Sequence, residues 1–530
     1  MISIQHLTYA HPNKDVLFND LQFTVGERVR AALIGNNGSG KSTLLKLIAG
    51  ELQPAGGKIQ LNASPCYLPQ LYGQYNHMTV AQALAVEKKL TALHEILSGH
   101  VTAANMDILN DDWTLEERCA QALQYWQLTG IDLQQSMASL SGGQKTRVLL
   151  AGISIHTPAL VLMDEPSNHL DAEGRSLLYS FVAQSNSTML VVSHDRELLD
   201  LLTPVYELSS TGITAYGGNY SFYKVQKQLE QEALYSDVKN QEKALRKARE
   251  KERETLERQQ RLDARGKQKQ EKAGVARIMM NTLRNKAENS TSRIRDVHAG
   301  KIDGIYQDLQ SLRAELPVTD QMRFGFADAQ ITRGKLLFGA RQINYRYKQE
   351  WLWAVDLDIE LYSGDRVVLR GANGSGKTTL VRIILGQLEP GKGTVVSQPV
   401  KAVYLDQEYS LIDGRLGVYE QAQQFNTAAL QEHEVKIRLN RFLFSSQYWD
   451  KSCASLSGGE RMRLALCCLT LSEQAPDLLM LDEPTNNLDI QNIEILTNAL
   501  KEYRGAVVLV SHDNTFLKEV GVEKEIWLKA

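Results

Sequence analysis

Residues 35–42 read Gly35-Asn36-Asn37-Gly38-Ser39-Gly40-Lys41-Ser42, and residues 371–378 repeat the pattern as Gly371-Ala372-Asn373-Gly374-Ser375-Gly376-Lys377-Thr378. In such a loop the glycines let backbone N–H groups turn toward phosphate oxygens, the lysine adds a positive charge, and the Ser or Thr hydroxyl can bind Mg²⁺. Each loop follows an apolar run and opens a segment with helical spacing of its apolar residues. This order of strand, loop and helix predicts two phosphate-binding sites, which we extend by one residue to Thr43 and Thr379.

Four further elements follow each loop in the same order. In the first half they are Gln70, Ser141-Gly142-Gly143-Gln144, Asp164-Glu165 and His194, and in the second half Gln407, Ser457-Gly458-Gly459-Glu460, Asp482-Glu483 and His512. Each aspartate ends an apolar run, as expected of a buried parallel strand that delivers a carboxylate to a metal ion. We expect Glu165 and Glu483 to polarise the attacking water, and His194 and His512 to hold that water in line. The pattern predicts two complete nucleotide-hydrolysing cassettes.

Composition agrees with a cytoplasmic enzyme. The chain has 530 residues, of which 43% are hydrophobic, enough for two or three domains with full-sized cores. Its five cysteines show no metal-ligand spacing, which indicates reduced thiols. The N-terminus lacks a signal-peptide pattern, and no apolar run approaches the roughly 18 residues needed to cross a bilayer. We therefore expect no membrane partner.

Charge is concentrated in the middle of the chain. Between residues 258 and 295, eleven basic residues face three acidic ones, although the whole chain has a net charge of -3. Such a basic stripe favours a nucleic-acid backbone as partner; the alternative is a solvated helix face. The residues expected to contact RNA are Lys272, Arg277, Arg284, Lys286, Arg293 and Arg295.

The same region reads as two long helices. Residues 223–269 are rich in helix-forming residues, and Ile302, Ile305, Leu309, Leu312 and Leu316 step by three and four positions until Pro317. This narrow apolar seam predicts an antiparallel hairpin. Its tip, at about residues 274–284, combines basic with apolar side chains.

The paired Ser-Gly-Gly signatures and Asp-Glu-Pro segments resemble those of ATP-binding cassette (ABC) ATPases. The resemblance implies an α/β fold and two ATP molecules, each with Mg²⁺, held between cassettes that face each other head to tail. The site of Lys41 would be completed by Ser457 and Gly459, and the site of Lys377 by Ser141 and Gly143. The metal would be held by Ser42, Gln70 and Asp164 in the first site, and by Thr378, Gln407 and Asp482 in the second.

One position departs from that family's pattern. The family usually places an aromatic residue on the adenine, a role that Tyr347 would take in the second cassette. The first cassette offers Tyr9 and His11 near the equivalent position, and the choice between them stays open.

Tandem cassettes that lack membrane segments, flank a charged helical linker and follow the motif Tyr216–Tyr223 are similar to the ABC-F proteins. This resemblance implies a monomer with intramolecular cassette pairing that binds the ribosome near the tRNA exit site. Its partners would be ribosomal RNA, with tRNA as a second candidate, and its role that of a translation factor or an antibiotic-resistance protein. The domains would be a first cassette at 1–222, a hairpin linker at 223–325 and a second cassette at 326–530.

The first cassette carries an insertion. Gln70 and Ser141 are 71 positions apart, whereas Gln407 and Ser457 are 50 apart, and the extra residues fall at about 92–116. This segment is either a functional arm, as in the ABC-F family, or a simple loop extension. Two other functions stay open for the whole chain: an ATPase that acts on DNA structure, and a soluble ATPase subunit of a transporter.

Overall fold

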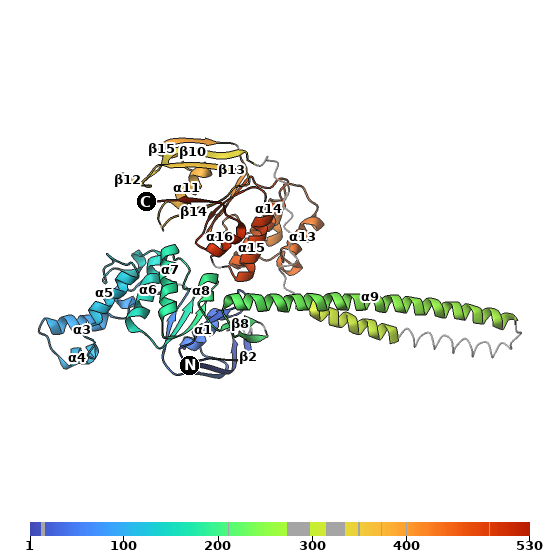
Figure 1. Ribbon diagram of the computed structural model, residues 1–530, viewed down its shortest axis with the longest axis horizontal. Coiled ribbons are helices and arrows are strands. Elements are labelled where there is room, and N and C mark those ends of the chain that lie inside the picture. The colour runs from blue at the N-terminus through green and yellow to red at the C-terminus, as the bar shows by residue number, and fades with distance from the viewer. Residues whose placement is uncertain are drawn as a thin grey trace. The chain divides into compact units, whose positions relative to one another are not determined.

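The computed structural model describes residues 1–11, 16–70, 72–209, 211–272, 297–313, 334–347, 350–372, 374–398, 400–486 and 488–529. The chain forms two compact units (Figure 1). One contains Met1–Phe222 and Gln321–Ala530, and the other contains Tyr223–Asp320.

The first cassette is built on a mostly parallel sheet with the strand order β5-β6-β7-β3-β8-β9. Only β9 is antiparallel to its neighbour. The strands are β5 (Pro65–Leu68), β6 (Leu160–Asp164), β7 (Thr188–Val192), β3 (Arg30–Ile34), β8 (Val205–Ser209) and β9 (Gly212–Tyr216). Every residue of β6 and β7 is buried, as aliphatic strands covered on both faces require.

A second, antiparallel sheet in this cassette has the order β2-β1-β4. Its strands are β1 (Ile2–Ala10), β2 (Val16–Val25) and β4 (Gly56–Leu61). Phe18 and Phe23 from this sheet pack with Leu44 and Leu45 and with Leu162 of β6 in one apolar core. The helices of the cassette are α1 (Lys41–Ala49), α2 (Val80–Ala83), α3 (Glu87–Leu97), α4 (Ala103–Leu109), α5 (Leu115–Tyr125), α6 (Gly142–His156), α7 (Ala172–Gln184) and α8 (Arg196–Asp200).

The second cassette repeats this topology. Its parallel sheet has the order β16-β17-β18-β14-β19, with β16 (Ala402–Leu405), β17 (Leu478–Asp482), β18 (Ala506–Val510), β14 (Arg366–Arg370) and β19 (Lys524–Trp527). The antiparallel strands are β10 (Leu336–Asn344), β13 (Leu357–Tyr362) and β15 (Lys392–Ser397), with a small hairpin of β11 (Arg346–Tyr347) and β12 (Glu350–Trp351). The helices are α11 (Lys377–Ile384), α12 (Val418–Gln424), α13 (Glu432–Arg441), α14 (Gly458–Thr470), α15 (Ile490–Glu502) and α16 (Asn514–Val520).

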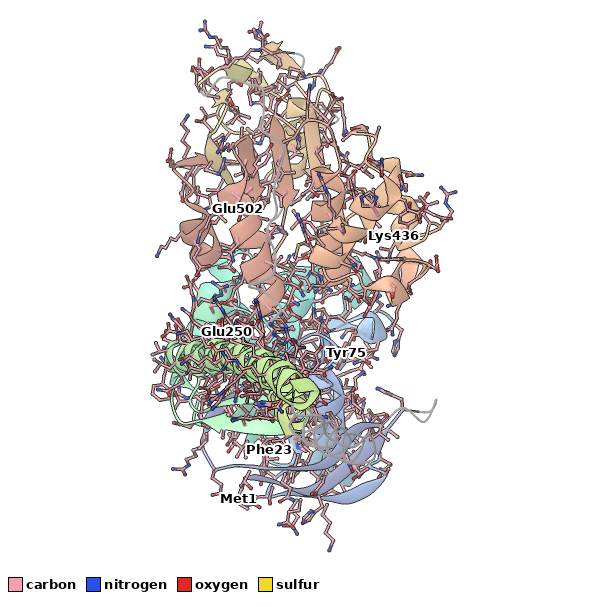
Figure 2. The ribbon with its side chains drawn as sticks, turned by 90° about the vertical axis from the view of Figure 1, so that its right-hand side faces the viewer. Met1, Phe23, Tyr75, Glu250, Lys436 and Glu502 are labelled. Carbon is pink, nitrogen blue, oxygen red and sulfur yellow. The ribbon has the colours of Figure 1, made fainter. Side chains whose placement is uncertain are left out.

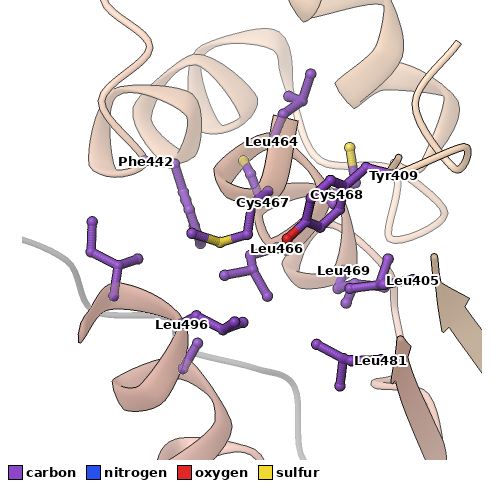
Figure 3. Close-up of a cluster of buried hydrophobic side chains, with 14 of the residues drawn as sticks. Leu405, Tyr409, Phe442, Leu464, Leu466, Cys467, Cys468, Leu469, Leu481 and Leu496 are labelled. Carbon is purple, nitrogen blue, oxygen red and sulfur yellow. The ribbon is translucent and has the colours of Figure 1, made fainter. Parts of the chain in front are cut away.

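Buried cysteines belong to the core of the second cassette. Figure 3 shows Cys467 and Cys468 on α14 among leucines, with Tyr409 and Phe442 beside them. Burial raises the pKa of both thiols. All five cysteines of the chain are free. These thiols therefore act as small apolar side chains.

The two cassettes differ in their helical parts. Between α2 and α5 the first cassette has α3 and α4, which pack on each other, whereas α12 leads directly to α13 in the second. The additional helical segment thus begins at Glu87, earlier than the start at about residue 92 that sequence spacing indicates.

The linker unit contains α9 (Tyr220–Lys272), which is 53 residues long, and a helical segment at 297–313 that runs beside it (Figure 1). Leu309 is buried, and Arg313 donates to Glu242 of α9 at 2.6 Å. Figure 2 shows α9 nearly end-on at Glu250, with its charged side chains directed outward. The predicted α/β fold with two cassettes and a long helix between them is confirmed, while the tip at residues 274–284 lies outside the described residues.

Candidate functional site: two nucleotide sites

Glycines shape the phosphate loop between β3 and α1. Gly35, Gly38 and Gly40 have φ values of 153°, 82° and 96°, in the region that only glycine adopts readily. A Cβ atom at Gly40 would lie 2.7 Å from the ring of Phe18, and one at Gly35 would meet the carbonyl oxygen of Leu208. The second loop has the same form, with φ of 156°, 86° and 88° at Gly371, Gly374 and Gly376. Asn373 lies outside the described residues.

The two loop lysines make the same contacts. Lys41 Nζ donates to the carbonyl oxygens of Gly35 at 2.7 Å and Asn36 at 3.1 Å, and Lys377 Nζ donates to those of Gly371 at 2.8 Å and Ala372 at 3.1 Å. Burial lowers the pKa of both lysines. Both ammonium groups are held at the mouth of the loop, where a phosphate oxygen would meet them.

Sheet register brings the acidic pair and the histidine together. Asp164 at the end of β6 pairs with Val192 at the end of β7, and His194 follows two residues later. The second cassette repeats this register with Asp482 opposite Val510. Because the strands are parallel, their carboxyl ends meet at one edge of the sheet, where ligands of open α/β folds bind.

Each glutamate lies against its histidine. His194 donates its backbone N–H to Glu165 Oε2 at 3.2 Å, and its Nε2 lies 3.3 Å from Oε1. In the second cassette, Nε2 of His512 lies 3.4 Å from Oε1 of Glu483. Glu165 and Glu483 have φ of 51° and 46°, a strained backbone for a non-glycine residue. That conformation turns each carboxylate away from the strand and toward the histidine.

Burial sets the protonation state of these groups. It raises the pKa of Glu165 and raises that of Glu483 to about 7. It lowers the pKa of His194 well below the usual value and that of His512 to about 4. The imidazoles are therefore neutral at physiological pH. A carboxylate whose pKa lies near neutrality is suited to take a proton from water.

The expected metal ligands form a set of hard oxygen donors, which fits Mg²⁺. Asp164 Oδ1 is buried and has no hydrogen-bond partner among the described residues, so it is available to a cation. Thr378 Oγ1 lies 3.5 Å from Asp482 Oδ2 in the second site. Gln70 lines the first pocket, while Gln407 is exposed on the loop after β16.

Two tyrosines that sequence reasoning missed contact the aspartates. Tyr404 on β16 donates its hydroxyl to Asp482 Oδ2 at 3.0 Å, and Tyr67 on β5 reaches Asp164 Oδ2 at 3.5 Å. Both stand three residues before the predicted glutamine ligand, in Tyr67-Leu68-Pro69-Gln70 and Tyr404-Leu405-Asp406-Gln407. That repeated spacing is the signal that would have found them.

The signature serines cap helices. Ser141 and Ser457 are the N-caps of α6 and α14, and each accepts a hydrogen bond from the backbone N–H of the third helical residue, Gln144 or Glu460, at 3.3 Å. Gly142 and Gly143, like Gly458 and Gly459, open these helices. A helix N-terminus attracts anions such as phosphate.

Residues of both cassettes meet at the first site. A pocket of about 390 Å³ is lined by Lys41, Gln70, Glu165, His194 and, from the second cassette, Ser457. Asp489, the N-cap of α15, accepts a hydrogen bond from the backbone N–H of Asn37 at 2.8 Å. The hydrogen bond between Asn37 and Asp489 was not expected from the sequence.

At the adenine end, His11 lines the first pocket and Tyr9 stands edge-on to it, with ring centroids 5.6 Å apart. Tyr347 is half-exposed, and its hydroxyl lies 3.1 Å from Thr379 Oγ1.

Among the residues expected to contact RNA, Arg277, Arg284, Lys286, Arg293 and Arg295 lie outside the described residues, and Lys272 is the last residue of α9. The described part of the linker contains a groove of about 540 Å³ between α9 and segment 297–313. Arg246, Arg249, Arg253 and Arg313 line this groove together with Tyr306. Positive charge thus continues along the stem of the linker.

Comparison with known proteins supports the same assignment. The family model "ABC transporter" matches residues 18–168 and 354–486, together more than half of the chain. The energy-dependent translational throttle protein EttA of Escherichia coli is 31% identical over 542 residues, covering 96% of this chain and 88% of EttA. ABC transporter F family member 5 of Arabidopsis thaliana is 27% identical over 559 residues, covering 98% of this chain and 74% of that protein.

A solved structure has the same fold. It is a complex of the archaeal ribosome recycling factor ABCE1 with a ribosomal stalk protein, with a TM-score of 0.61 at 18% identity, covering 98% of this chain and 87% of the matched chain. Two cassettes with intact nucleotide-site motifs define an ATP-binding cassette ATPase, and the chain belongs to this family, in its ABC-F branch. Across the helices that the structure describes, none has the length and apolar character of a membrane span.

Proposed function

We propose that this ATPase is a cytoplasmic protein that binds the ribosome near the tRNA exit site and couples ATP hydrolysis to translation or to protection from antibiotics. The observation that carries the proposal is the 53-residue helix α9, which leads from one cassette into a strongly basic segment. A basic helical projection suits the phosphate backbone of RNA. EttA, by its name a translational throttle, supports the same direction.

At each nucleotide site we assign the phosphate contacts to the glycine-rich loop and its lysine. Ser42, Gln70 and Asp164 would hold Mg²⁺ in the first site, and Thr378, Gln407 and Asp482 in the second. Bound Mg²⁺ would neutralise charge on the phosphates. Glu165 and Glu483 then orient a water molecule for attack on the γ-phosphate, and His194 and His512 keep each glutamate in place.

Pairing of the cassettes completes each site in this proposal. The presence of Ser457 in the pocket of Lys41, and the hydrogen bond from Asn37 to Asp489, support it for the first site. The second site would be completed in the same way by Ser141. Since both cassettes share one polypeptide, the pairing needs no second chain, and we propose a monomer.

Sedimentation with ribosomes tests the proposed function. The protein is mixed with ribosomes and centrifuged through a sucrose cushion, with a non-hydrolysable ATP analogue or without nucleotide. We expect co-sedimentation that depends on the analogue, and its loss in the variant Lys41→Ala, Lys377→Ala. If the protein instead stays in the supernatant and is retained on DNA under the same conditions, the ribosomal assignment is wrong.

A further inference from the structure

Tyr67 and Tyr404 occupy equivalent places in the two cassettes. Each stands on the strand next to the one that ends in the predicted metal-binding aspartate, because β5 pairs with β6 and β16 pairs with β17. Each phenol reaches the Oδ2 atom of that aspartate, at 3.5 Å from Tyr67 and at 3.0 Å from Tyr404. A contact that recurs in both copies, across different neighbouring side chains, indicates a shared role.

The two carboxylate oxygens of Asp164 have different surroundings. Oδ2 faces the phenol of Tyr67, whereas Oδ1 is buried without a hydrogen-bond partner among the described residues. A tyrosine hydroxyl, with an ordinary pKa near 10, is a hydrogen-bond donor at neutral pH. Its bond to one oxygen fixes the rotation of the carboxylate and leaves the other oxygen for a ligand.

In the second cassette, Asp482 Oδ2 faces two hydroxyls. Tyr404 donates at 3.0 Å, and Thr378 Oγ1 lies at 3.5 Å from the same oxygen. Thr378 is itself a proposed metal ligand, so the phenol holds the aspartate beside it. A side chain that orients a ligand through a hydrogen bond commonly changes metal affinity as much as some ligands do.

We infer that Tyr67 and Tyr404 are positioning residues that orient Asp164 and Asp482 toward the metal ion that accompanies ATP. The inference deepens the proposed function and rests on the nucleotide sites assigned there. Neither tyrosine contacts the nucleotide in this role, since each acts through the aspartate. The shorter bond of Tyr404 predicts a larger effect in the second site than in the first.

Metal-dependent nucleotide binding separates this role from a structural one. A fluorescent ATP analogue is titrated in Mg²⁺ and again in EDTA, and the ratio of the two affinities measures the metal's contribution. The second site is measured in the Lys41→Ala background and the first in the Lys377→Ala background. Orienting hydrogen bonds of this kind are worth about 10-fold to 100-fold in metal affinity, so we expect Tyr404→Phe to lower the ratio by about tenfold. For Tyr67→Phe, with its longer bond, we expect about threefold.

Affinity in EDTA should stay unchanged, because the phenols do not contact the phosphate loop. The matched controls are Tyr206→Phe and Tyr503→Phe, which remove buried phenol hydroxyls that donate to the backbone carbonyls of Thr24 and Pro476. A ratio in Tyr404→Phe equal to that of the parent protein overturns the inference, as does an equal loss of affinity in Mg²⁺ and in EDTA. A parent protein whose binding ignores Mg²⁺ would overturn the proposed nucleotide chemistry itself.

Discussion

Replacing Glu483 by Gln should abolish most hydrolysis at the second site and at the same time stabilise the free protein. Glutamine has the same shape and still offers an oxygen to its surroundings, but it cannot take a proton. Loss of a general base typically lowers the rate by about 10²-fold to 10⁴-fold. Measured with Glu165→Gln in the same chain, so that neither site turns over, the residual ATPase rate should fall at least about 100-fold.

The stability gain follows from the pKa of the buried carboxyl. Burial raises the pKa of Glu483 from 4.5 to about 7, so the folded protein favours the protonated form. The destabilisation is absent below the unfolded pKa, grows as the pH rises toward 7, and is complete above it. At about 1.4 kcal/mol per pKa unit, the buried charge costs on the order of 3 kcal/mol above pH 7, which Gln removes.

Thermal unfolding of the nucleotide-free protein measures this gain. For a domain of this size 1 kcal/mol shifts Tm by about 2–4 °C, so the transition of the second cassette should rise by roughly 5–10 °C at pH 8 and hardly at all at pH 4.5. Glu502→Gln, on the exposed end of α15, serves as the control for charge loss alone. Parental turnover in the double variant, or an equal Tm shift at both pH values, would refute the reasoning.

Three further changes probe other parts of the molecule. Ser457→Trp should impair ATP binding at the site of Lys41, whose pocket it lines, and spare the site of Lys377, as site-resolved nucleotide titrations in the two lysine variants would show; equal impairment of both sites contradicts head-to-tail pairing. Gly40→Val should reduce ATP affinity at the first site by more than about tenfold, because a branched side chain at a φ of 96° meets Phe18; unchanged equilibrium binding would count against the loop geometry. Neutralising Arg277, Arg284 and Lys286 should weaken ribosome binding and reduce its log–log salt slope by roughly one unit for each phosphate that is no longer neutralised, whereas an unaltered slope near physiological salt means that the stripe is a solvated helix face.

Local pattern predicted much of the molecule because its main signals are contiguous in sequence. The glycines of the loop, the apolar strand before Asp164 and the helix-forming composition after residue 223 each carry their own information. The structure accordingly has β6 ending at Asp164 and α9 running from Tyr220 to Lys272.

Interactions between distant residues were harder to predict. Tyr67 and Asp164 are 97 positions apart, and Asn37 and Asp489 are 452 apart. The first pair depends on which strand lies next to β6, and the second on how the two cassettes face each other. Neither choice is encoded in the spacing of residues along one segment. Internal repetition could have supplied the tyrosines, because Tyr-Leu-x-Gln occurs at the same place in both halves.

The cap of α14 makes the two composite sites chemically unequal. Ser457 Oγ donates its single hydrogen to Glu460 Oε2 at 2.9 Å, while the corresponding position after Ser141 is the neutral Gln144. A γ-phosphate that approaches Ser457 must compete with a carboxylate for that hydrogen and also meets its negative charge. Nucleotide entry at the Lys41 site therefore exchanges one anionic acceptor for another, so its net gain is smaller and its occupancy responds more strongly to salt and to ATP concentration. The two halves of one duplicated machine thus act as a sensitive site and a tight site within a single chain.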